Sequence, residues 1–168
     1  LDKEISPGLD MFNHAAAEHR SGKNADAAFK SAFELLQKEA EAGNLKSRVT
    51  LGVMCEHGIG TKQDSIAAAR NYRIAADAGY DEGKYELASF WVDNGMNLED
   101  ALKYANELIQ TTPSNVKYYA LRGMILYLQG SNKQGFEDFK KVFSLEGTTR
   151  SSYEVRDFML GYVDKLIE

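Results

Sequence analysis

The single cysteine and one of the three histidines lie close together in the stretch LGVMCEHGIGTKQD, residues 51–64. A thiol beside an imidazole is the pairing that a cysteine nucleophile or a metal site requires. Cys55 and His57 are two residues apart, however, and side chains with this spacing point about 200° away from each other on a helix. The spacing argues against catalysis, and we expect Cys55 to be a buried packing residue.

The same stretch contains the short glycine sequence GIGTK, residues 58–62. It lacks the Walker pattern GxxxxGK[ST], and the pattern GxGxxG fails because residue 63 is glutamine. A dinucleotide-binding turn follows a strand, and no strand is predicted before this sequence. We interpret Gly58 and Gly60 as a tight connection between two helices, with Asp64 capping the second one.

The other histidines and the neighbouring carboxylates form no recognisable chemical site. His14 and His19 are five residues apart, so they diverge on a helix, and structural zinc normally requires two close pairs of ligands. Asp81 and Glu82 fall at the start of a predicted helix, where acidic groups interact favourably with the positive end of the helix dipole. We therefore expect no metal, no cofactor and no catalytic residue.

The composition is that of a globular chain, with 43% hydrophobic residues, 27% charged residues and a net charge of −5. The acidic balance argues against nucleic acid and anionic membrane surfaces as partners, because both require a basic face. The longest apolar run, residues 124–128, is far shorter than the roughly 20 residues that span a bilayer. We expect a soluble chain with no membrane insertion.

A single cysteine cannot form an internal disulfide, so the cysteine content does not identify the cellular compartment. Because the first residue is leucine, we expect that an N-terminal segment has been removed. Both a cytoplasmic location and a periplasmic one after loss of a signal peptide are compatible with the sequence. The oligomeric state is also left open.

Helical periodicity dominates the chain. Phe136, Phe139 and Phe143 form an apolar stripe with helical spacing, and similar stripes are separated by short glycine-rich or capping sequences. These signals predict nine helices of similar length. The predicted ranges are 7–21, 24–42, 44–57, 64–78, 81–94, 97–111, 115–129, 132–146 and 149–167.

The helices recur with a fixed period. Gly22, Gly58, Gly95 and Gly130 each end the first helix of a pair, and they are 36, 37 and 35 residues apart. The pattern predicts an all-α fold, an α/α solenoid of about four helical hairpins plus a C-terminal helix, in a single domain over 1–168. Its parts are an N-terminal capping pair (7–43), repeats at 44–79, 80–114 and 115–147, and a C-terminal capping helix (148–168).

Residues 45–79 resemble a Sel-like repeat, a relative of the tetratricopeptide repeat. The matching positions are Leu51, Gly52, Gly58, Gly60, Asp64, Ala68, Tyr72, Ala75, Ala76 and Gly79. Two positions depart from the pattern: Cys55 stands where an aromatic residue is usual, and Asn71 stands where the family prefers tryptophan.

The resemblance extends to the following repeats. Residues 81–114 match the pattern at Leu87, Ala88, Trp91, Ala101 and Pro113. Residues 116–147 resemble an ordinary tetratricopeptide repeat at Tyr119, Gly123, Gly135, Phe139 and Val142, with Arg122 as a departure. We expect the small residues to lie where paired helices cross, Gly52 against Ala68 and Gly123 against Gly135.

The resemblance implies a non-catalytic protein-protein interaction module that binds a partner protein or peptide on the concave face formed by the first helices. The ligand-facing positions of the family fall here on Asp10, Asn13, Arg20, Lys46, Glu56, His57, Glu82, Tyr85, Asp93, Lys117 and Tyr127. An alternative is an immunity protein that occludes a bacterial toxin, since an acidic chain suits a basic toxin. An enzyme with an unrecognised site is the third hypothesis.

Overall fold

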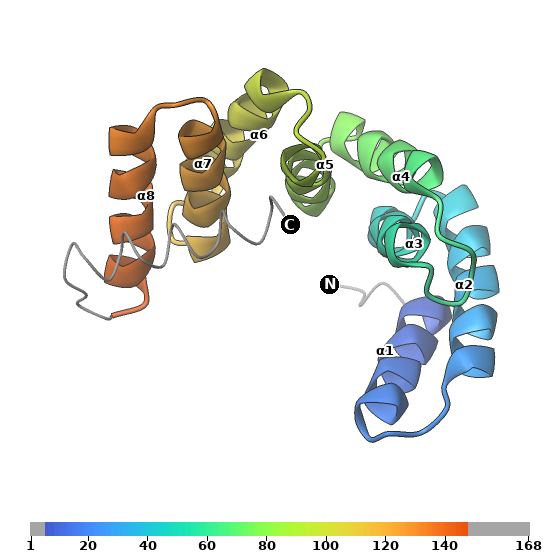
Figure 1. Cartoon of the computed structure of the whole chain (residues 1–168). Coiled ribbons are helices and arrows are strands. Elements are labelled where there is room, and N and C mark those ends of the chain that lie inside the picture. The colour runs from blue at the N-terminus through green and yellow to red at the C-terminus, as the bar shows by residue number, and fades with distance from the viewer. Residues whose placement is uncertain (1–5, 148–168) are drawn as a thin grey trace. The chain divides into compact units, whose positions relative to one another are not determined.

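Eight α-helices account for most of residues 6–147, the part of the chain that the computed structural model describes, and this part contains no strand (Figure 1). The helices are α1 (Pro7–Arg20), α2 (Asp26–Glu41), α3 (Leu45–His57), α4 (Ser65–Asp77), α5 (Asp81–Asp93), α6 (Leu98–Thr111), α7 (Val116–Leu128) and α8 (Asn132–Leu145). Each begins and ends within two residues of its predicted range. The predicted helix at 149–167 lies outside the described residues.

Capping residues set the helix boundaries. Asp64 accepts a 2.9 Å hydrogen bond from the backbone N–H of Ala67 at the start of α4, and Asn44 accepts one of the same length from Ser47 at the start of α3. Gly58 ends α3 with a φ of +67°, a left-handed conformation that glycine adopts without strain from a Cβ. The interpretation of GIGTK as a helix connection is confirmed.

The chain divides into two compact units, which we call the N-terminal unit (Leu1–Gly83) and the C-terminal unit (Lys84–Glu168). The N-terminal unit contains α1 to α4. The C-terminal unit contains α6, α7, α8 and all of α5 beyond its first three residues. The single domain predicted from the sequence, with its capping helix at 148–168, stays a prediction.

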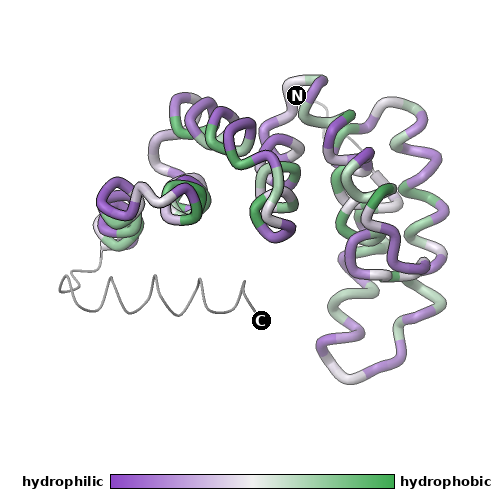
Figure 2. The backbone as a smooth tube through the Cα atoms, turned by 45° about the horizontal axis from the view of Figure 1, so that its top comes forward, coloured by the Kyte–Doolittle hydropathy of each residue, from purple (hydrophilic) through white to green (hydrophobic). Residues whose placement is uncertain are grey.

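In the N-terminal unit, α2 packs against both α1 and α3, and α3 pairs with α4. Phe29 and Leu36 of α2 meet Leu51 and Met54 of α3 in a common buried cluster. Polar and apolar residues alternate along these helices (Figure 2), as expected when one face of each helix is buried. None of the helices within residues 6–147 combines the length and the apolar character needed to cross a membrane.

One carboxylate joins the first three helices. Glu39 of α2 accepts hydrogen bonds from the hydroxyl of Ser6 (2.5 Å), the hydroxyl of Ser47 (2.6 Å) and the backbone N–H of Gly8 (2.7 Å). Ser6 also caps α1 through the N–H of Leu9. Burial raises the pKa of Glu39, but these hydrogen bonds favour the charged form more strongly, so its pKa lies below the ordinary value.

In the C-terminal unit, α7 packs against both α6 and α8. A Cβ atom added at Gly135 of α8 would lie 2.6 Å from the carbonyl oxygen of Gly123 on α7. The predicted crossing of these two glycines is confirmed. In the N-terminal unit, by contrast, a Cβ atom added at Gly52 would first meet the ring of Tyr72 and not Ala68. Gly52 is small because a fully buried tyrosine ring occupies the space beside it.

Candidate functional site

A groove of about 370 Å³ lies in the C-terminal unit between α5 and α7, the first helices of two successive hairpins. Its lining residues are Tyr85, Glu86, Ser89, Val92 and Asp93 of α5 and Lys117, Ala120, Leu121 and Met124 of α7. Each of these residues lies three or four positions from another lining residue of the same helix. They therefore share one face, and the two faces oppose each other across the groove.

The groove has an apolar floor and a charged rim. Val92, Leu121 and Met124 are buried, while Asp93 and Lys117 are exposed. This combination of an apolar base with a few polar groups above it is typical of surfaces that bind polypeptide segments.

Tyr85 is held in place on the groove wall. Its ring centroid lies 5.9 Å from that of Tyr118, and the ammonium nitrogen of Lys117 lies 5.8 Å from the Tyr85 centroid. Tyr118 is buried and Tyr85 is half-buried, so the second ring fixes the first while leaving part of it exposed. A fixed and partly exposed aromatic side chain loses little entropy on binding, which suits an anchor residue.

The structure brings together three of the residues expected from the sequence, Tyr85, Asp93 and Lys117. Tyr127 also belongs to α7 but is not part of the groove lining. Glu86 and Ser89 also line the groove but are not among the residues expected from the sequence. Ser89 lies one helical turn after Tyr85 on the same face, so a helical wheel of α5 would have identified it, whereas Glu86 directly follows Tyr85 and points about 100° away from it.

The other expected residues belong to the N-terminal unit. Arg20 is exposed at the end of α1, Lys46 is exposed near the start of α3, and Glu82 is exposed in the first turn of α5. His57 is exposed at the end of α3. Asp10 and Asn13 of α1 are exposed as well.

Glu56, expected as a partner contact, has a partner within the chain. Its carboxylate accepts a 2.6 Å hydrogen bond from the hydroxyl of Tyr72, whose ring is fully buried against Gly52. This bond satisfies the phenol at the edge of the core. The bond joins α3 to α4, and a contact of Glu56 with a partner protein stays a prediction.

Cys55 has the properties of a packing residue and not of a nucleophile. It is buried, with 6% of its surface exposed, whereas His57 is exposed. Burial raises the pKa of the Cys55 thiol, and the nearby carboxylate of Asp64 raises it further. A thiolate is thus disfavoured at neutral pH. Among residues 6–147 there is no group of three or more His, Cys, Asp and Glu side chains placed to hold a metal ion.

Helical hairpins with small residues at their crossings define a helical-repeat protein, and solved structures bear this out. No protein-family model and no curated protein sequence matches the chain. Over 82% of its length the chain is similar, at 23% identity and a TM-score of 0.61, to a protective antigen of uropathogenic Escherichia coli strains that displays an SLR fold. It is also similar over 83% of its length, at 19% identity and a TM-score of 0.58, to a Sel1 repeat protein from Oxalobacter formigenes.

A third similar structure is a double mutant of MamA RS-1, at 15% identity and a TM-score of 0.63, with 94% of this chain and 85% of that one covered. The chain spans 30% of the Escherichia coli antigen and 59% of the Oxalobacter protein. These likenesses establish the fold: the chain has the Sel-like and tetratricopeptide-like helical-repeat architecture, and the predicted α/α-solenoid class is confirmed.

Proposed function

We propose that the chain is a non-catalytic protein-interaction module, and that a segment of a partner protein binds in the groove between α5 and α7. The observation that carries this proposal is the convergence of Tyr85, Asp93 and Lys117 on one groove with a buried apolar floor. Helical-repeat folds suit this role because their adjacent helices present extended surfaces to a partner. The prediction that the first helices of all hairpins share one concave binding face stays a prediction.

The side chains of the groove indicate which chemical groups a partner segment should carry. Glu86 and Asp93 contribute two carboxylates, and Lys117 contributes a cation beside Tyr85. Leu121 and Met124 provide an apolar base. A segment that places an apolar side chain on this base and a basic side chain near the carboxylates would be complementary, and the net charge of −5 would steer such a basic partner toward the chain.

The test compares two serine-to-arginine variants. Partners are captured on the immobilised chain, identified by mass spectrometry and then titrated in purified form. Ser89→Arg fills the groove, so we expect its Kd for the partner to be at least about tenfold weaker. Ser144→Arg places the same side chain at an exposed position of α8 and leaves the affinity unchanged. Equal binding by wild type and Ser89→Arg would show that the groove is not the site.

A second comparison uses Tyr85→Ala and Tyr127→Ala. As a groove anchor, Tyr85 is expected to contribute about 1–2 kcal/mol to binding. The effect of Tyr127→Ala tells whether the contact surface extends along α7 beyond the groove. If partner affinity is unchanged in both variants while the thermal midpoint falls sharply, these tyrosines are core residues and the assignment is wrong.

A second candidate function is that of an immunity protein that occludes a basic toxin. The net charge of −5 and the carboxylates on the groove favour it. Affinity separates the two functions, because a toxin inhibitor requires a nanomolar Kd or tighter, whereas an adaptor works with a micromolar one. A nanomolar complex that abolishes the partner's toxicity would establish the inhibitor, and a set of micromolar partners would establish the adaptor.

A further inference from the structure

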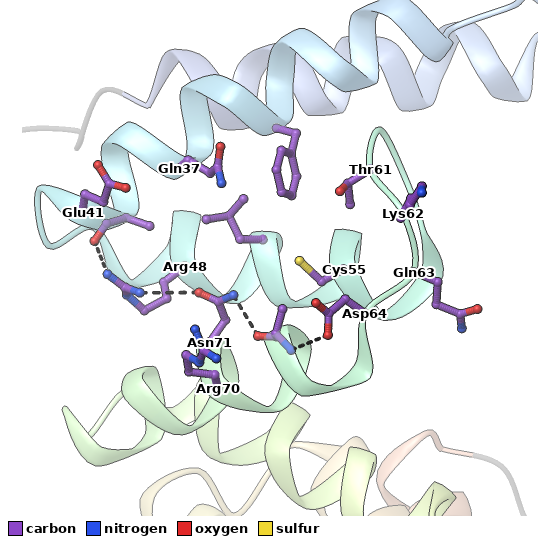
Figure 3. A pocket seen from close by; sticks show the side chains of 14 residues that line it. Gln37, Glu41, Arg48, Cys55, Thr61, Lys62, Gln63, Asp64, Arg70 and Asn71 are labelled. Atoms are coloured by element: carbon purple, nitrogen blue, oxygen red, sulfur yellow. Dashed lines mark hydrogen bonds between the residues drawn. The ribbon is translucent and has the colours of Figure 1, made fainter.

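A second cavity, of about 650 Å³, lies in the N-terminal unit between α2 and α4, with α3 as its floor (Figure 3). Phe33, Leu51 and Cys55 give it an apolar base. The side chains of Arg48 and Asn71 lie at one end, and the loop that leads to Asp64 lies at the other. This cavity shares no residue with the groove between α5 and α7.

The repeat register shows which side chains correspond to this region in the next hairpin. Leu51, Met54 and Cys55 of α3 lie 36 residues before Leu87, Phe90 and Trp91 of α5, and all six are buried. Ala68, Tyr72 and Ala75 of α4 lie 33 residues before Ala101, Ala105 and Leu108 of α6, and all six are again buried. By this register Cys55 corresponds to Trp91, and Asn71 corresponds to Tyr104.

In the hairpin of α5 and α6, the two counterparts are aromatic and stack on each other. The rings of Trp91 and Tyr104 are 5.8 Å apart, with an angle of 5° between their planes. In the hairpin of α3 and α4, the same two positions hold the small side chains of Cys55 and Asn71, and both line the cavity. The cavity thus occupies the place where the next repeat carries aromatic side chains.

The polar groups around this place are already ordered. Arg48 donates a hydrogen bond of 2.5 Å to the carbonyl oxygen of Ala40 and one of 3.4 Å to the side-chain oxygen of Asn71. Asn71 in turn donates a 2.9 Å bond to the carbonyl oxygen of Ala67. Arg70 lies next to Asn71 at the same end of the cavity (Figure 3). Two guanidinium groups therefore border a partly apolar cavity.

We propose that this cavity receives an aromatic side chain, tryptophan or tyrosine, from a partner polypeptide. The ring would lie against Phe33, Leu51 and Cys55, which provide apolar contact. Arg48 and Arg70 favour the negative face of an aromatic ring over an aliphatic side chain. An apolar cavity of about 150 Å³ already holds a benzene molecule, so the volume admits an indole or phenol ring with water around it.

The test uses N-acetyl-tryptophanamide as the probe and N-acetyl-leucinamide as the comparison. In a titration followed by nuclear magnetic resonance, we expect the tryptophan probe to shift the side-chain resonances of Asn71 and Arg48 saturably, with a millimolar Kd. Because Cys55 is the only cysteine, its alkylation gives a second readout. Probe at about ten times its Kd should slow alkylation about tenfold. The leucine compound should do neither at equal concentration.

Variants locate the binding in the cavity. Asn71→Tyr restores the residue type found at the corresponding position 104 and should abolish probe binding, while Asn132→Tyr, at an exposed position of α8, should leave it unchanged. If Asn71→Tyr does not fold, Arg70→Glu is the variant that tests the proposal. Arg70 is exposed, so the substitution should leave the fold intact, and the reversed charge should weaken the affinity for the tryptophan probe about threefold. Absence of saturable shifts, equal binding of the leucine compound, or full binding by the folded variants would overturn the proposal. Loss of binding in Ser89→Arg would also contradict it, since that residue lies in the other groove.

Discussion

Arg122 and Asp138 form a two-point ion pair between α7 and α8. The Nε and one terminal nitrogen of Arg122 each donate a 2.7 Å hydrogen bond to a different carboxylate oxygen of Asp138. The other terminal nitrogen donates a 3.0 Å bond to the side chain of Asn106 on α6, and the guanidinium lies 5.7 Å from the centroid of the Tyr119 ring. Asp138 is buried, with 5% of its surface exposed. One arginine thus ties together three helices of the C-terminal unit.

The first prediction concerns the removal of one partner of this pair. In Arg122→Leu the buried carboxylate of Asp138 loses its cation, so we expect the free energy of unfolding to fall by about 3 kcal/mol. In the double variant Arg122→Leu/Asp138→Leu no buried charge remains, and much of the loss should be recovered. Urea unfolding of the wild type, both single variants and the double variant measures the coupling. Additive effects of the two substitutions would show that the ion pair contributes nothing specific.

The second prediction is a dependence of stability on pH that arises from Glu39. Its pKa in the folded chain lies below the ordinary value of 4.5 because three hydrogen bonds favour the carboxylate. Between the two pKa values the unfolded chain binds more protons than the folded one, so stability rises with pH there. The contribution is complete above about pH 4.5 and is lost as the pH falls through the lower, folded pKa.

Glu39→Gln tests this contribution. We expect this substitution to lower the free energy of unfolding by about 2 kcal/mol at pH 7. The amide is uncharged, and its N–H₂ group would face the hydroxyl and N–H donors that now bond to the carboxylate. The cost should shrink as the pH falls below about 4.5, where the unfolded chain takes up a proton at this carboxyl before the folded chain does. Glu34→Gln, at an exposed position of the same helix, is the control and should show no such trend. A cost for Glu39→Gln that is equal at pH 7 and pH 3 would contradict the proposed charge effect.

Local signals made the helices predictable from the sequence. Asp64 and Asn44 bond to backbone N–H groups within three residues, and Gly58 needs only its own backbone freedom. Such interactions are encoded by neighbouring residues, so helix ends follow from the local sequence. The crossing of Gly123 and Gly135 was predictable for a similar reason, since the two helices form one hairpin.

Contacts between distant residues were not predictable in the same way. Glu39 bonds to Ser6 and Ser47, which lie 33 and 8 residues away, and no periodicity identifies such a set. Arg122 was visible as a departure from the repeat pattern, but its partner Asp138 depends on how α7 and α8 are aligned side by side. The three groove residues that were predicted came from the repeat register. The place of Glu86 in the groove lining depends instead on how α5 and α7 are oriented toward each other.

The third prediction concerns the reactivity of Cys55. Its thiol is buried and its pKa is raised by burial and by Asp64, so alkylation at pH 7 should be much slower in the folded chain than in urea. The rate should keep rising with pH up to and beyond 9, because the thiol titrates above its ordinary value of 9.0. His57→Ala should not change the rate, since His57 is exposed at the helix end. A drop of tenfold or more in that variant would restore the hypothesis of a thiol and imidazole pair.

The fourth prediction concerns Gly135, where helix propensity and packing have opposite effects. In an open helical position, alanine in place of glycine stabilises a helix by about 1 kcal/mol. At Gly135, however, the new Cβ would lie 2.6 Å from the backbone oxygen of Gly123, which cannot move away as a flexible side chain would. We therefore expect Gly135→Ala to lower the free energy of unfolding by about 2 kcal/mol in spite of the better propensity.

The neighbouring variant Gln134→Ala supplies the control for this comparison, because it changes propensity at an exposed position of the same helical turn. Its stability should stay within about 0.5 kcal/mol of the wild type. Chemical unfolding monitored by circular dichroism measures both variants. A second variant, Gly123→Ala, would bring its Cβ to 2.9 Å from the Phe139 ring and 3.1 Å from the oxygen of Gly135, so it should also destabilise the chain. If Gly135→Ala proved more stable than the wild type, α7 and α8 would have to lie further apart than the structure places them.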